Sequence, residues 1–157
     1  MKYNDLYNSV VVKRALSPSA GPTDNTAQVS EIIDTYGAEG VLFVIATGSL
    51  ADADATFTVL IEDGDAANLS DAAAVPDASL VGTNAAGAAP EAAASFTFAD
   101  DNEVKKIGYI PRKRYVRMTI TPAANASAAA MAAVAVLHGL RHMPAQHADG
   151  DAITQVP

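Results

Sequence analysis

Hydrophobic and polar residues alternate along much of this chain with the two-residue period of β-strands. The clearest case is segment 55–64, in which Phe57, Val59 and Ile61 share one face while threonines, Leu60 and a glutamate share the other. The same period predicts strands in three further segments: 95–100, 102–110 and 112–121.

Four other segments contain apolar runs. The β-branched run in 9–16 predicts a strand, and the continuous apolar run in 40–48, bounded by glycines, predicts a strand buried on both faces. Segment 131–139 predicts a strand, with a helix as the alternative because alanine favours helices. Segment 27–37 fits a short helix and a strand equally well.

These segments amount to seven or eight short strands with turn signals between them. The pattern predicts an all-β fold, a single-domain β-sandwich or jelly-roll-like fold. A length of 157 residues fits one domain. We expect an N-terminal arm at 1–8, the sandwich over 9–139 and an extended C-terminal tail over 140–157. Within the Ala-rich segment 63–95 we expect loops with one short strand near "ASLVG".

Charge is distributed very unevenly. The net charge is −8, residues 15–103 contain fifteen acids and no Lys or Arg, and residues 104–148 contain seven bases and no acid. The sequence predicts a salt-bridge face, within the chain or between chains, at Lys105, Lys106, Arg112, Lys113, Arg114, Tyr115 and Arg117. Arg117 and Tyr115 share a polar face on which a cation could lie over the ring. Nucleic acid is not expected as a partner, because the acidic surface repels phosphate.

Two other groups of residues are candidate metal ligands. The acids in 52–56 and 62–71 could supply oxygen ligands to Ca²⁺, although Asp and Asn beside Gly are first of all turn formers. His138 and His142 are four residues apart and His147 follows, but Gly139 and Pro144 would break a helix there. We therefore expect solvated histidines, no metal site and no cofactor.

The sequence offers no pattern that favours catalysis. There is no cysteine, and the nucleophile-elbow, phosphate-loop and zinc-protease motifs are missing. We expect no enzyme activity. The start of the chain does not resemble a signal peptide and no apolar stretch reaches 18 residues, so we expect a protein made in a cytoplasm with no membrane partner.

Four phrases occur in order along the chain: "DLYNSVVVKRAL", "TFTVLIEDGDAANLSDA", "KKIGYIPRKRYVRMTITP" and "AAVAVLHGLRHMP". Over residues 5–144 the chain resembles a family of small virion structural proteins of tailed bacteriophages, similar to head decoration (cement) proteins. The resemblance implies a non-enzymatic protein on the capsid surface of a virion, made in the host bacterial cytoplasm. The implied partners are the major capsid protein and further copies of the chain, as a dimer or trimer.

With that resemblance, the basic stretch becomes a hypothetical docking face for a neighbouring copy or for acidic groups on a capsid. Two alternatives stay open. One is another virion component, such as a tail or neck protein. The other is a host-surface or carbohydrate-binding module, which would need exposed aromatic residues, and this chain has 6% aromatic residues and no Trp.

Overall fold

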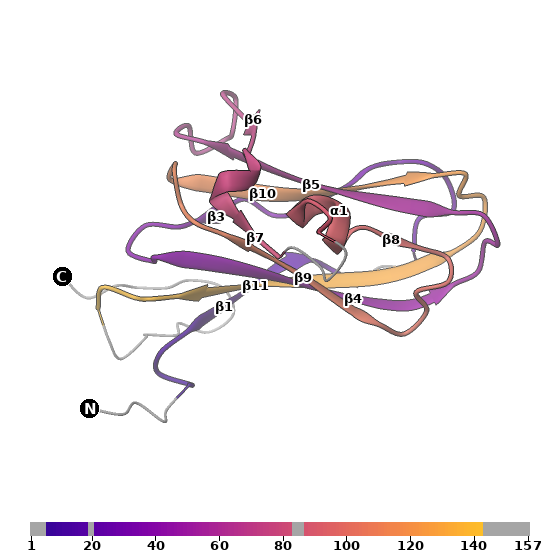
Figure 1. Ribbon diagram of the computed structural model, residues 1–157, viewed down its shortest axis with the longest axis horizontal. Coiled ribbons are helices and arrows are strands. Elements are labelled where there is room, and N and C mark those ends of the chain that lie inside the picture. Colours follow the sequence, from indigo (N-terminus) through magenta and orange to yellow (C-terminus); the bar gives the residue numbers. More distant parts are fainter. Residues whose placement is uncertain (1–5, 19–20, 83–86, 143–157) are drawn as a thin grey trace.

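The chain folds into two packed antiparallel β-sheets (Figure 1). The computed structural model describes residues 6–18, 21–82 and 87–142. The first sheet, here called sheet A, contains five strands, in the spatial order β1 (Val11–Leu16), β11 (Ala129–His138), β4 (Gly40–Leu50), β9 (Val104–Tyr109) and β7 (Leu80–Val81).

The second sheet, sheet B, is built around the long antiparallel pair β10 (Tyr115–Ala123) and β5 (Thr56–Gly64). Two short strands, β2 (Gln28–Val29) and β3 (Ile33–Asp34), pair with β10. Two others, β6 (Ala73–Ala74) and β8 (Phe96–Thr97), pair with β5. The predicted all-β sandwich is confirmed. The described residues form eleven strands rather than seven or eight, because five of the strands are only two residues long.

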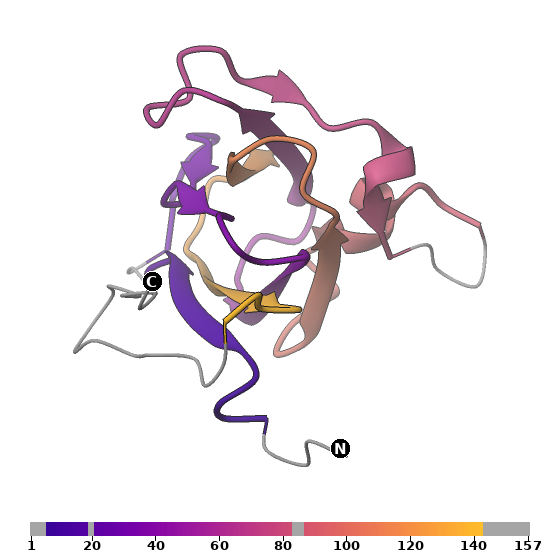
Figure 2. The ribbon, with the colours of Figure 1, turned by 90° about the vertical axis from the view of Figure 1, so that its left-hand side faces the viewer.

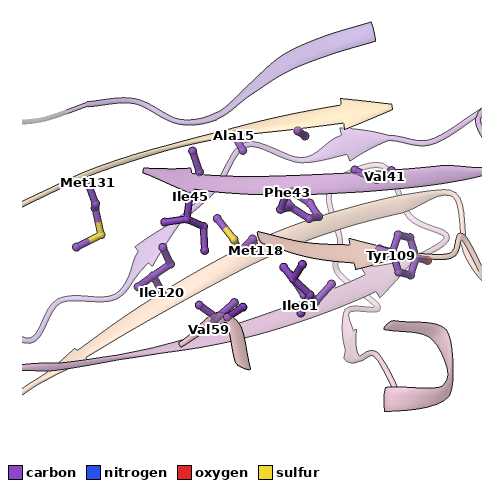
Figure 3. Close-up of a cluster of buried hydrophobic side chains, with 14 of the residues drawn as sticks. Ala15, Val41, Phe43, Ile45, Val59, Ile61, Tyr109, Met118, Ile120 and Met131 are labelled. Atoms are coloured by element: carbon purple, nitrogen blue, oxygen red, sulfur yellow. The ribbon is translucent and has the colours of Figure 1, made fainter. Parts of the chain in front are cut away.

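The hydrophobic core lies between the two sheets. Seen from the end in Figure 2, the strands surround the space that the core side chains fill. Phe57, Val59 and Ile61 of β5 are buried, as their alternation predicted. Facing side chains from both sheets complete the cluster shown in Figure 3, among them Phe43, Ile45, Tyr109, Met118 and Ile120.

Strand β4 corrects one prediction. Its Val41, Phe43 and Ile45 are fully buried, but Leu42 and Val44 are only partly buried. The expectation that segment 40–48 is buried on both faces is therefore wrong. The physical reason is that sheet A is an outer layer, so sheet B covers one of its faces only.

The two ambiguous segments are strands. Segment 27–37 contains β2 and β3 and no helix, and segment 131–139 lies almost wholly within β11. Segment 63–95 contains the expected short strand, β7. It also contains β6, a 3₁₀ turn at Asp77–Ser79 and a one-turn helix α1 (Pro90–Ala94), which were not expected. Proline at the first helical position suits α1, because its fixed backbone angle matches a helix start.

Helix α1 fills a gap along the outer edge of β5. Between the stretches paired with β8 and β6, the backbone N–H of Val59 donates to Ser95 Oγ at 3.0 Å. The N–H of Ile61 donates to Glu91 Oε1 at 2.6 Å. Side-chain oxygens thus replace a neighbouring strand, and this part of the edge is closed to further strand pairing.

The ends of the chain are described in part. Residues 1–5 of the expected arm and residues 143–157 of the expected tail lie outside the described residues. Leu6 and Tyr7 are exposed before β1. After β11, Leu140 packs against the core and Arg141 N–H donates to Gly37 O at 2.9 Å. No helix in the described ranges is long and apolar enough to cross a membrane.

Candidate functional site

Strand β10 brings the basic stretch beside acidic residues far away in the sequence. Its register against β5 places Arg117 opposite Glu62 and Val116 opposite Asp63. On its other side, β3 places Asp34 opposite Tyr115. Bases and acids that are segregated along the chain are therefore neighbours in sheet B.

Asp63 is the centre of the tightest of these contacts. Its side chain has 0% exposed surface, and it accepts hydrogen bonds from Arg112 Nε at 3.1 Å and Nη2 at 2.9 Å. The hydroxyl of Tyr109 donates to the same carboxylate at 2.9 Å. Burial, with a contribution from Asp63, raises the pKa of Tyr109, and the hydrogen bond to Asp63 raises the pKa of Arg112. Tyr109 therefore stays a neutral donor and Arg112 stays a cation.

Two further arginines are paired across strands. Arg114 Nη2 lies 2.9 Å from Asp34 Oδ2, and Arg117 Nε lies 2.9 Å from Glu62 Oε2. Burial raises the pKa of Asp34, but hydrogen bonds from Arg114 and from its own loop outweigh this and leave it below its usual value.

A cation does lie over the ring of Tyr115, but it is Arg114 and not Arg117. The guanidinium of Arg114 lies 5.2 Å from the ring centres of both Tyr36 and Tyr115. The Arg117 guanidinium is directed to Glu62 on the neighbouring strand. The carboxylate of Glu62 lies directly opposite Arg117 on β5 and carries the opposite charge. The ring of Tyr115, on the same strand as Arg117, carries no charge.

The lysines of the basic stretch differ from one another. Lys105 Nζ lies 2.7 Å from Asp100 Oδ1 and 2.8 Å from Glu103 Oε2, and these contacts raise the pKa of Lys105. Lys113 lies 4.0 Å from Asp71. Lys106 is exposed and, within the described part of the chain, forms no ion pair. Five of the six bases are thus neutralised internally, and the docking role of the seven residues stays a prediction.

A different surface is formed by the outer face of sheet A. The register between strands places its outward side chains in rows that cross the sheet. The first row crosses all five strands and consists of Val12, Val136, Leu42, Gly108 and Val81. The second row consists of Arg14, Val134, Val44 and Lys106. The third row consists of Ala132, Ala46 and Val104.

This outer face is apolar and open to solvent. Val12 is 53% exposed, Val81 is 56% exposed and Val104 is 65% exposed. The outward face of a sheet without a partner is ordinarily polar. Sheet B follows that rule, since Thr58, Arg117 and Thr119 lie on its outer side. Monomeric soluble proteins rarely expose a contiguous apolar face of this kind, so this face is the candidate interaction surface.

The outer face contains a shallow hollow of about 350 Å³ near β7. Gly108 stands in the first row between Leu42 and Val81, so the side chain that would fill this position is missing. A Cβ added to Gly108 would lie 3.2 Å from Val81 Cβ. At the other end of the hollow, the ring of His138 occupies the space above Gly40.

The acids that could serve as calcium ligands have other roles. Asp71 accepts the N–H groups of Asp65 and Ala66, and Asp52 accepts the N–H of Ala126. These acids thus hold turns and loops. Across 6–18, 21–82 and 87–142, no three His, Cys, Asp or Glu side chains are grouped so as to hold a metal ion. His147 lies outside the described residues.

Sequence reasoning missed the outer face of sheet A. A signal was present, because the valine run 10–12 and the segment "GVLFVIATG" are apolar at both alternate sets of positions. The pattern of the second segment predicts a strand buried on both faces, which the structure does not show. A doubly apolar strand is equally compatible with one face in the core and the other face awaiting a partner.

Comparisons with known proteins leave the family of the chain open. No protein-family model matches the sequence, and no curated protein matches it. Among solved structures, the fold is similar to part of dimeric latent PorU from Porphyromonas gingivalis, with a TM-score of 0.39 and 7% sequence identity. That match covers 84% of this chain and 12% of the PorU chain, so this chain spans a small part of that protein's length.

Proposed function

We propose that this protein is a non-enzymatic structural protein of a tailed-bacteriophage virion that binds the outside of the capsid and stabilises it. The class of protein comes from the resemblance of residues 5–144 to phage head decoration proteins. The observation that carries the proposal is the exposed apolar outer face of sheet A, because a protein with no partner would cover such a face with polar side chains.

A capsid shell is a suitable partner for a small β-sandwich protein. It presents one surface many times, so a modest affinity for each copy is multiplied when neighbouring copies also touch. The proposed partners are the major capsid protein and other copies of this chain, as a dimer or trimer. The protein would be made in the host bacterial cytoplasm and would end on the capsid surface.

The test is co-sedimentation of the purified protein with shells assembled from the major capsid protein of its own phage. Saturable binding at a fixed ratio to the shell subunit, together with a higher melting temperature of the shell, is the expected result. Failure to bind both immature and expanded shells would reject the proposal and favour a tail or neck component.

A further inference from the structure

We draw no further inference here: the strongest candidate, the exposed apolar outer face of sheet A with its hollow beside Gly108, carries none because nothing in the structure shows what covers it.

Discussion

The hydroxyl of Tyr109 donates a 2.9 Å hydrogen bond to the carboxylate of Asp63, and this contact joins the two sheets across the core. Tyr109 belongs to β9 of sheet A and Asp63 belongs to β5 of sheet B. The same hydroxyl accepts the backbone N–H groups of Arg112 and Lys113, at 3.0 Å and 3.2 Å. One side chain therefore fixes the turn between β9 and β10 and the distance between the sheets.

The first prediction concerns Tyr109→Phe. The ring and its packing stay, but the buried carboxylate of Asp63 loses one of its donors and two backbone N–H groups lose their acceptor. We expect the free energy of unfolding to fall by about 1–3 kcal/mol, measured by urea denaturation at neutral pH. Tyr115→Phe is the control, and a change below about 0.5 kcal/mol is expected for it. Equal effects of the two variants would contradict the cross-sheet role of Tyr109.

The second prediction compares two arginines that each pair with an aspartate. Arg112→Met leaves Asp63 charged, with no exposed side-chain surface, whereas Arg114→Met leaves Asp34 with 34% of its side chain exposed to water. An unpaired buried charge costs far more than an unpaired exposed one. We expect the larger fall in melting temperature for Arg112→Met. A larger fall for Arg114→Met would show that its contacts with Tyr36 and Tyr115 matter more than the burial of Asp63.

The third prediction concerns the pH dependence set by Glu91. Burial raises the pKa of this carboxyl group above its usual 4.5, although its carboxylate accepts the N–H of Ile61. Because the folded state binds the proton more strongly, this group's contribution to stability is fully present below pH 4.5 and is lost as the pH rises through the raised pKa. At neutral pH the folded protein therefore carries the cost of a partly buried charge.

Glu91→Gln keeps an oxygen acceptor for Ile61 and removes that cost. We expect the variant to be more stable than the wild type at pH 7, by less than about 1 kcal/mol because water still reaches the group. Below pH 4 the difference should disappear. Unfolding measured at a series of pH values checks both points, and an advantage that persists at low pH would mean that charge burial is not its cause.

The fourth prediction concerns the edge of β5. Ser95→Ala removes the oxygen that accepts the N–H of Val59 and should lower the free energy of unfolding by about 1–2 kcal/mol. Amide hydrogen exchange gives the specific readout. The Val59 amide should exchange faster, while the Ile61 amide, held by Glu91, should change less. Ser95→Thr keeps the hydroxyl and should retain slow exchange at Val59. Unchanged exchange in Ser95→Ala would show that another group closes this edge.

The sequence by itself determined where most strands lie and, where polar and apolar residues alternate, which side chains face the core. Alternation is a local property, because neighbouring residues in a strand point to opposite faces whatever surrounds them. Phe57, Val59 and Ile61 could be assigned to the core for this reason. The segregation of acids and bases was equally plain, and it correctly indicated salt bridges between distant segments.

Only the tertiary structure decided which acid each base meets. Arg112 and Asp63 are 49 residues apart, and Arg114 and Asp34 are 80 apart, so their pairing depends on strand order and register. A shift of one residue in the register of β10 against β5 would have placed Arg117 on the other face of the sheet from Glu62.

The tertiary structure also decided which apolar side chains stay exposed. Val44 and Phe43 are neighbours in one apolar run, and nothing local distinguishes a second buried face from an exposed one. The layer count settles this, because β4 lies in a sheet covered on one side only. The position of the short helix α1 also depends on tertiary structure. Helix α1 forms where the oxygens of its Glu91 and of Ser95, which follows it, meet N–H groups on β5 that no strand pairs, and its own alanine-rich sequence does not specify this.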